Sequence, residues 1–266
     1  MTHRYGWRPD KPDRRDRYRL RRAGVALPPY VDLTAQMPAV YDQGSLGSCT
    51  GNAIAAAVEY TRRKQSLADF VPSRLFIYYN ERDIEGTVSS DAGAEIRDGI
   101  KSVVSLGACA ETEWPYDVSQ FATKPSDQCY ADAKKDLVTR YARVDQTLDG
   151  LRQCLADGFP VVFGFTVYES FESDAVAQSG VVPMPTAGED MLGGHATLMV
   201  GYDDAHQQFI VRNSWGLSWG RGGYFLMPYA YPTDGDLASD FWQIDAVTTG
   251  PGSQHIATSS SEIAAH

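Results

Sequence analysis

The most distinct helical pattern in the chain follows a glycine-rich loop. Apolar residues at positions 53, 54, 57 and 58 lie on one face of an α-helix and predict a helix over residues 49–64. Residues 114–140 show little periodicity and predict a loop with one short helix. Capping residues and apolar spacing predict further helices at 72–81, from Ile96 to a stop at Gly107, and from a cap at Thr147 to Gly158.

After Pro160 the pattern changes to short runs of β-branched and aromatic residues, which predict strands. Residues 203–206 predict a hairpin turn, and 170–192 predict a long loop or insertion. A helical half is therefore expected to precede a mainly antiparallel half, which is an α+β fold. The predicted strands are 161–167, 195–202, 208–211, 223–227 and 241–247.

Composition narrows the functional classes. The 266 residues are 43% hydrophobic and 22% charged, as in a soluble globular protein with a substantial core. The net charge of −10 gives no support to nucleic-acid binding, and no apolar run is long enough to span a membrane. The N-terminus lacks the apolar segment of a secretory signal. We expect a cytoplasmic protein, one exported without a recognisable signal, or a trimmed sequence.

The four cysteines, at 49, 109, 129 and 154, form no CxxC pair. A zinc site is therefore not expected, and no metal or other cofactor is predicted. If Cys49 is set aside, three remain, and an odd number argues against a full disulfide framework. A single Cys109–Cys129 bridge stays open as an alternative. The cysteine usage favours a reducing compartment.

Cys49 begins the predicted helix of residues 49–64, where unpaired N–H groups and the helix dipole favour negative charge. This position is expected to lower the pKa of the thiol and to favour the nucleophilic thiolate. A nucleophilic thiol needs a base and a group that orients the base. His195 lies 146 residues after Cys49 (195 − 49), Asn213 lies 164 after it (213 − 49), and Gln43 lies six before it.

These residues lie in motifs that resemble the papain family of cysteine peptidases. The motifs are residues 43–52 around Cys49, 193–202 around His195, 213–224 (Asn-Ser-Trp-Gly through Gly-Gly-Tyr) and 27–33. The resemblance covers about residues 27–249. It implies a two-lobed papain-like fold with a helical lobe at about 37–140, an antiparallel β-barrel-like lobe at about 141–249, and the active-site cleft between them. Leu46 stands where many relatives carry a disulfide cysteine, as in the disulfide-poor microbial branch.

The resemblance also implies the chemistry. Cys49 would attack the peptide carbonyl to form an acyl-enzyme, and His195 would pair with the thiolate and protonate the leaving amine. Asn213 would orient the imidazole, and Trp215 would shield that contact from water. The Gln43 amide and the Cys49 backbone N–H would form the oxyanion hole. Thr50 replaces the usual aromatic residue after the nucleophile, so the packing behind Cys49 is expected to differ.

Substrate-binding residues follow from the same resemblance. Gly93, with Ala92, would let a peptide pair along the backbone of the helical lobe. Gly164 and Ala196 would line the pocket for the residue second from the scissile bond. The other residues implied on the substrate side are Gly194, Trp215 and Trp219.

Two other functions compete with a thiol endopeptidase. A Cys–His transamidase or cell-wall amidase usually orients its histidine with Asp or a second His. Asn213 in this role therefore argues against that function. A catalytically silent peptide-binding relative would have lost Cys49, His195 or Gln43, and all three are present. The expected partner is a peptide or protein substrate, and the chain is expected to be a monomer.

Residues 1–26 differ from the rest of the chain. From Met1 to Arg22 they carry nine Lys or Arg and three Asp, a balance of +6 that leaves −16 for the remainder. One interpretation is a solvated, disordered arm. The other is an inhibitory leader of a zymogen, a basic segment with Tyr5, Trp7 and Tyr18 held on an acidic body. Residues 250–266 are expected to form a flexible tail.

Overall fold

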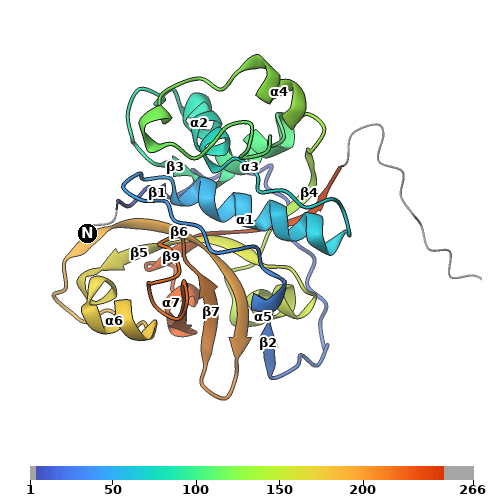
Figure 1. The fold of residues 1–266 in the computed structure, drawn as a ribbon. Helices are drawn as coiled ribbons and strands as arrows, with labels where there is room; N and C mark the ends of the chain where they lie inside the picture. Colours follow the sequence, from blue (N-terminus) through green and yellow to red (C-terminus); the bar gives the residue numbers. More distant parts are fainter. Residues whose placement is uncertain (1–3, 249–266) are drawn as a thin grey trace, which may run out of the picture.

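The computed structural model describes residues 4–248. One group of helices covers one side of the molecule, and a twisted sheet with three shorter helices makes the other (Figure 1). Within the helical group, helix α1 lies nearest the sheet. The first group contains α1 (Cys49–Lys64), α2 (Arg74–Glu85), α3 (Ile96–Ser105) and α4 (Asp127–Ala133).

A seven-stranded, mainly antiparallel sheet forms the second half, in the order β4-β9-β5-β6-β7-β8. Strand β2 (Tyr30–Asp32) extends it by pairing with the end of β6. The sheet is open, because β4 and β8 pair with each other nowhere in residues 4–248. The other strands are β4 (Val138–Arg143), β5 (Val161–Tyr168), β6 (Met191–Asp203), β7 (Gln208–Arg212), β8 (Tyr224–Pro228) and β9 (Ala238–Val247).

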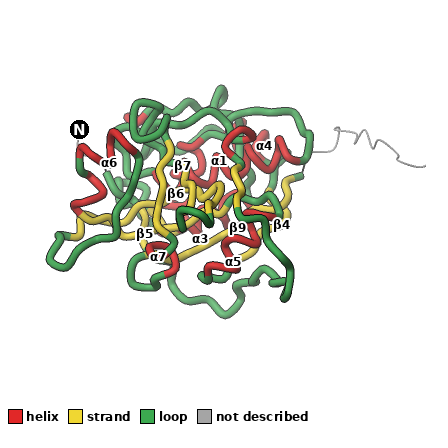
Figure 2. The backbone as a smooth tube through the Cα atoms, turned by 90° about the horizontal axis from the view of Figure 1, so that it is seen from below, coloured by secondary structure: helices red, strands yellow, loops and turns green. Residues whose placement is uncertain are grey.

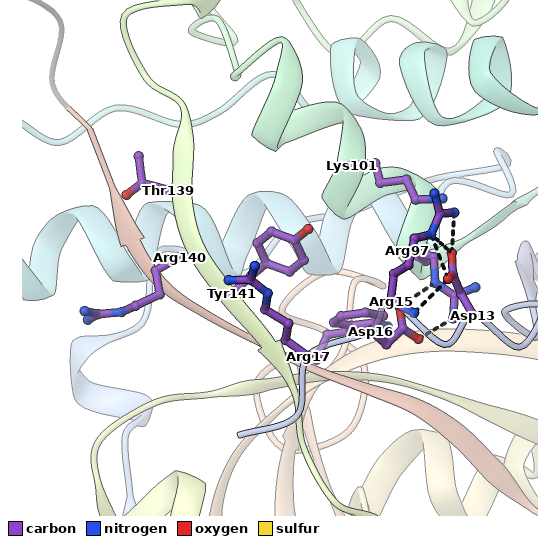
Figure 3. Close-up of a pocket in the computed structure, with 10 residues that line it drawn as sticks. Asp13, Arg15, Asp16, Arg17, Arg97, Lys101, Thr139, Arg140 and Tyr141 are labelled. Carbon is purple, nitrogen blue, oxygen red and sulfur yellow. Dashed lines mark hydrogen bonds and ion pairs between the residues drawn. The ribbon is translucent and has the colours of Figure 1, made fainter. Parts of the chain in front are cut away.

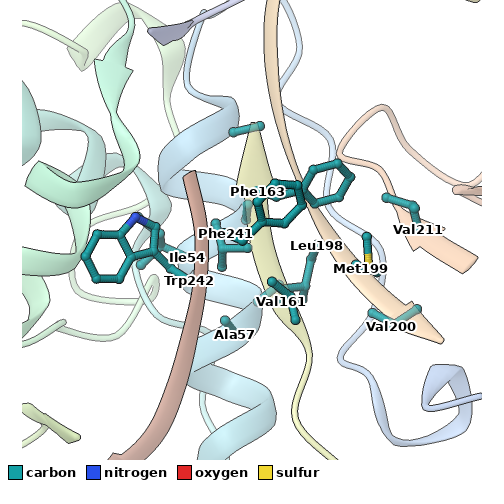
Figure 4. Close-up of a cluster of buried hydrophobic side chains, with 14 of the residues drawn as sticks. Ile54, Ala57, Val161, Phe163, Leu198, Met199, Val200, Val211, Phe241 and Trp242 are labelled. Carbon is teal, nitrogen blue, oxygen red and sulfur yellow. The ribbon is translucent and has the colours of Figure 1, made fainter. Parts of the chain in front are cut away.

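Helix α1 is buried on nearly all sides, because the sheet packs on one face and α2 and α3 on the other. The small residues Ala53, Ala55, Ala56 and Ala57 allow both neighbours to approach closely. Figure 4 shows this core: side chains of β5, β6 and β9 lie against α1 near Ile54. The nucleophile candidate at the first residue of α1 is therefore fixed to the rigid centre of the protein.

Three short helices flank the sheet: α5 (Leu148–Ala156), α6 (Asp174–Ser179) and α7 (Ala230–Thr233) (Figure 2). The Thr147 hydroxyl accepts a hydrogen bond from the N–H of Gly150, which confirms the predicted cap of α5. No helix within residues 4–248 is long and apolar enough to cross a membrane.

The predicted α+β order of the elements is confirmed, with local differences. Strand β4 was expected to be loop; it lies at the sheet edge with mostly exposed side chains and so lacks an alternating apolar pattern. The predicted loop at 170–192 contains α6, and β6 begins at Met191, before the predicted start at 195. All four cysteines are free thiols, so the Cys109–Cys129 bridge is absent. The tail predicted at 250–266 lies outside the described residues.

Candidate active site

Cys49 and His195 come from different halves of the protein and meet where α1 abuts β6. The Cys49 sulfur accepts a hydrogen bond from the backbone N–H of Ala196, the residue after His195. The imidazole Nε2 lies 2.8 Å from Oδ1 of Asn213. The Trp215 indole stacks on the imidazole, with centroids 4.9 Å apart and an interplanar angle of 25°. The sequence prediction that these four residues share one site agrees with this geometry.

Asn213 is held from both sides of its short turn. Its backbone N–H donates to the carbonyl of Gly223, and its Oδ1 also accepts the N–H of Ser214 at 2.8 Å. Oδ1 therefore faces the imidazole as an acceptor, which requires a proton on Nε2 of His195. Any proton that His195 exchanges with Cys49 is then carried by Nδ1.

The amide of Gln43 is oriented in the same way. The Ser214 hydroxyl donates to Oε1 of Gln43 at 2.7 Å, so the NH₂ group must point the other way. That group donates to the carbonyl of Leu46 at 2.9 Å and to the carbonyl of Arg4 at 3.1 Å. A donor fixed in advance and directed at a peptide carbonyl is what an oxyanion hole needs.

Of these two carbonyls, that of Arg4 belongs to the N-terminal arm, which we define as residues 4–26. The arm lies between β3 (Ala94–Glu95) and β6 as strand β1 (Trp7–Arg8), which runs parallel to β3. The Gly6 carbonyl accepts the N–H of Ala94 at 2.7 Å, and the Gly6 backbone N–H donates to the Cys49 sulfur. The expectation of a solvated, disordered arm is therefore wrong for residues 5–8, which are buried or half-buried.

Trp7 fills a pocket floored by glycine. A Cβ atom on Gly164 would lie 1.9 Å from the Trp7 ring, and one on Gly194 would lie 2.4 Å from the Trp7 carbonyl. At the bottom of the pocket the indole N–H donates to Oδ2 of Asp240 at 3.2 Å. The two glycines thus leave a flat slot that an indole occupies.

Tyr5 covers the other side of Cys49 and His195. Its ring makes an edge-on contact with His195 (6.2 Å, 74°) and lies 6.3 Å from Trp215, and its hydroxyl donates to Glu172. With Gly6 and Trp7 it buries Cys49 and His195 completely, since neither residue has any exposed surface.

Ion pairs fix the arm farther along. Asp16 pairs with Arg97 at 2.6 Å and with Arg143 at 2.7 Å, and buried Asp10 pairs with Arg143 at 2.7 Å. Figure 3 shows Arg97 beside Asp16 at the edge of a surface pocket of about 410 Å³ between arm and body. Both carboxylates belong to the arm and both guanidinium groups to the body. At this point the charges are the reverse of the predicted basic arm on an acidic body. Elsewhere arm cations pair with body carboxylates as predicted, for example Arg4 with Asp91 and Arg22 with Asp157.

The cleft also gathers three carboxylates. Glu85, Glu95 and Asp98 each place an oxygen within 4.8 Å of the others, and two arm cations pair with them: Arg8 with Glu85, and Lys11 with Glu95 at 3.7 Å. The Arg8 guanidinium and the Lys11 ammonium of the arm thus supply positive charge at Glu85 and Glu95. The sequence-based expectation of no metal site stays a prediction.

The pKa of the Cys49 thiol is shifted in the opposite direction to the one expected from the sequence. Burial raises its pKa to about 11, while the N–H groups of Ala196 and Gly6 act in the opposite direction. A helix N-terminus contributes about 0.3–1 kcal/mol, which is less than one pKa unit, whereas full burial shifts a pKa by several. With the arm in place, the thiol is therefore held in its neutral form.

Thr50 explains part of this environment. Its hydroxyl donates to Glu81 in α2, and burial raises the pKa of that carboxyl to about 8. Where relatives are expected to carry an aromatic side chain behind the nucleophile, this chain has a buried hydroxyl–carboxyl pair. Glu81 was not singled out from the sequence, because nothing in its helical context marks it as different from a surface glutamate.

The other predicted substrate residues are placed unevenly. Gly93 adopts φ +68°, and a Cβ atom there would lie 2.0 Å from the Gly6 carbonyl, so close backbone approach requires glycine. Ala196 is buried against Cys49, and Ala92 is exposed at the cleft rim. Trp219 packs edge-on behind Trp215 at 5.0 Å and supports the indole from the side. Sequence reasoning did not identify Asp240 or Glu172, which meet the arm only through the tertiary fold.

The chain is similar to known proteins of one family. The family described as papain family cysteine protease matches residues 27–240. A peptidase C1-like protein of Acanthamoeba polyphaga mimivirus is 49% identical over 216 residues, covering 78% of this chain and 70% of that protein. Across three curated relatives, the chain spans 58–70% of their length.

Two solved structures are also similar. The crystal structure of xylellain, a cysteine protease from Xylella fastidiosa, is 48% identical, with a TM-score of 0.85 over 93% of this chain and 96% of that one. A procathepsin B from Trypanosoma congolense shares the fold at 17% identity, with a TM-score of 0.70 over 93% of this chain and 87% of that one.

Proposed function

The chain belongs to the papain family of cysteine proteases, and from this premise we propose that it is a latent peptidase whose own N-terminal arm closes the active site. In this proposal Cys49, His195, Asn213 and Gln43 hydrolyse peptide bonds once residues 4–8 leave the cleft. The observation that carries it is the course of Tyr5, Gly6 and Trp7 directly over Cys49 and His195.

In the reaction His195 accepts a proton twice and donates it twice. Nδ1 takes the Cys49 proton, and the thiolate attacks the substrate carbonyl to form a tetrahedral oxyanion. The imidazolium then protonates the leaving amine, which departs and leaves a thioester on Cys49. Water, deprotonated by the same imidazole, attacks the thioester and releases the acid with the thiol restored. Asn213 keeps the ring orientation through both halves.

The arm's direction supports inhibition rather than cleavage. In a substrate, the residue on the acyl side of the scissile bond places its carbonyl at Gln43. The residue before it in the substrate sequence is second from the scissile bond and enters the pocket for that position. In the arm, Trp7 fills that pocket, yet it follows Arg4, whose carbonyl meets Gln43. The arm therefore runs opposite to a substrate and presents no bond for attack. The name procathepsin, carried by a fold relative, is consistent with a proform.

Tethering strengthens this inhibition. Because the arm is covalently attached, it competes with substrate at an effective concentration of about the millimolar range for a short flexible connection. A peptide substrate can therefore bind only after the arm has left the active site. The full chain is expected to show low basal hydrolysis.

Removing the side-chain donor of the oxyanion hole tests the catalytic part of the proposal. In a chain whose cleft is opened by Gly6→Leu, adding Gln43→Ala is expected to lower kcat/KM for a fluorogenic peptide by roughly 10²–10³. The effect should be mainly on kcat, since the donor acts on the oxyanion. Gln120→Ala is the matched control, because Gln120 is exposed. Equal activity of the Gln43 and Gln120 variants would contradict the assignment.

Latency should depend on pH through Asp10. Burial and the neighbouring charge of Asp240 raise the pKa of Asp10 to about 7, although Arg97 and Arg143 face the same carboxylate. The docked arm thus binds this proton more tightly than a free arm with the ordinary value of 3.8. Its contribution to docking is complete below about pH 4 and is lost as the pH rises through about 7.

The measurement is the activity of the native chain divided by that of the Gly6→Leu chain at each pH, which cancels the pH dependence of catalysis. This ratio is expected to rise several-fold from pH 6 to pH 8.5. Asp10→Asn should flatten it, whereas Asp149→Asn, at a side chain that is 74% exposed, should not. A ratio that falls with rising pH would overturn the role of Asp10.

A further inference from the structure

The acidic cluster of Glu85, Glu95 and Asp98 lies one residue farther along the cleft than the Trp7 pocket. In the pairing of β1 with β3, Trp7 lies opposite Ala94 and Arg8 lies opposite Glu95. Moving away from Cys49, the arm therefore places Gly6, Trp7 and Arg8 at successive positions. A peptide that replaces the arm would fill the same positions with its first, second and third residues on the acyl side of the scissile bond.

The cluster is built around a cation. The Arg8 guanidinium pairs with Glu85, whose side chain is only 7% exposed. The other oxygen of Glu85 accepts the N–H of Glu95 at 2.7 Å, which fixes both carboxylates relative to the strand. Glu95 in turn accepts the backbone N–H of Lys11 at 3.2 Å, and the Lys11 ammonium lies 3.7 Å from it.

The body itself supplies little compensating charge. Lys101 pairs with Asp98 at 3.0 Å, and for Glu85 and Glu95 the ion pairs found in residues 4–248 are those with the arm. Behind the cluster, Oε2 of fully buried Glu81 has no hydrogen-bond partner among the described residues and lies beside Gly99. When the arm leaves, Glu85 and Glu95 lose their cations while their oxygens stay within 4.8 Å of each other and of an oxygen of Asp98, and this like-charge repulsion favours the binding of a new cation.

We propose that Glu85 and Glu95 form a substrate subsite that selects a basic side chain, arginine or lysine, at the third residue on the acyl side of the scissile bond. This inference rests on the proposed function and adds a substrate class to it: peptides with a bulky side chain for the Gly164–Gly194 slot, preceded by a basic residue. Arg8 shows the position that such a side chain occupies.

The test uses the full chain opened by Gly6→Leu and two fluorogenic peptides that differ only at the third residue, arginine or citrulline. Citrulline keeps the shape of arginine without its charge. We expect kcat/KM to be about 10-fold or more higher for the arginine peptide, as for a hydrogen bond to a charged group. The Glu85→Gln/Glu95→Gln pair should bring the ratio close to one. Glu113→Gln, an exposed glutamate, should leave the ratio as it is.

Equal cleavage of both peptides by the opened chain would overturn the subsite while leaving the peptidase function intact. A ratio that persists in the Glu85→Gln/Glu95→Gln chain would also overturn it. A binding measurement separates the subsite from the proposed peptidase function. The Kd of both peptides is measured on a Gly6→Leu chain that also carries Cys49→Ala. If the arginine peptide binds more tightly to this chain but the Gly6→Leu chain with Cys49 intact cleaves neither peptide, the subsite is supported and the proposed function is contradicted.

Discussion

A chain that carries Gly6→Leu is expected to hydrolyse a fluorogenic peptide roughly 10-fold to 100-fold faster than the native chain. A Cβ atom on Gly6 would lie 1.7 Å from the carbonyl oxygen of Gly47, so no side chain fits while the arm is docked. Forcing atoms into a packed site costs about 1–3 kcal/mol, which corresponds to that range of arm release.

The same substitution should expose the nucleophile. With the arm docked, burial raises the pKa of Cys49 to about 11, so the thiol is mostly protonated at pH 7. Labelling by iodoacetamide should therefore be slow in the native chain and faster in the Gly6→Leu chain, as measured by mass spectrometry of the Cys49 peptide.

Gly235→Leu is the matched control, because nothing lies within 4 Å of a Cβ atom at that glycine. It should leave hydrolysis and labelling at the native level, and the thermal unfolding of both variants should show that the body is folded. A folded Gly6→Leu chain with native rates of hydrolysis and Cys49 labelling would refute the docking of the arm as the cause of latency.

Cys49→Ala in the opened chain is expected to reduce kcat by about 10⁶, the loss found when the nucleophile of a hydrolase is removed. The residual rate would come from oxyanion stabilisation and substrate binding alone. Because α1 is anchored by small buried residues on both faces, loss of one sulfur at its first residue should leave the fold intact.

Cys109→Ala is the control for this loss. Cys109 is also buried, yet it packs with Phe76 and Cys129 in a separate cluster and should affect stability without affecting kcat. If Cys49→Ala and Cys109→Ala chains hydrolyse peptide equally, the acyl-enzyme on Cys49 is excluded.

The sequence predicted the elements that carry strong periodicity. Helix α1 begins at Cys49 and ends at Lys64 as expected, because its alanines and apolar residues recur at helical spacing. Strand β4 escaped prediction since its exposed edge position removes the alternation on which a strand prediction depends. Helix α6 has six residues, too few for its period to be distinguished from a loop.

The residues proposed for catalysis could be singled out from the sequence because their local motifs are distinctive. The arrangement of Trp7 over Gly164 was not, since it depends on how two segments 157 residues apart (164 − 7) complement each other in space. The pKa of Cys49 was predicted in the wrong direction for the same reason. A local rule describes the helix end, whereas the arm that buries the thiol is known only from the tertiary structure.

The flat slot between Gly164 and Gly194 couples two properties that are usually treated as separate. In the proposed function the same surface binds the indole of the arm and a substrate side chain, so a substitution that changes substrate preference would also change how tightly the arm docks. In a relative with a wider slot, a different residue at position 7 would be needed for the arm to fill it. We therefore expect residues 7, 164 and 194 to change together among relatives that keep both traits.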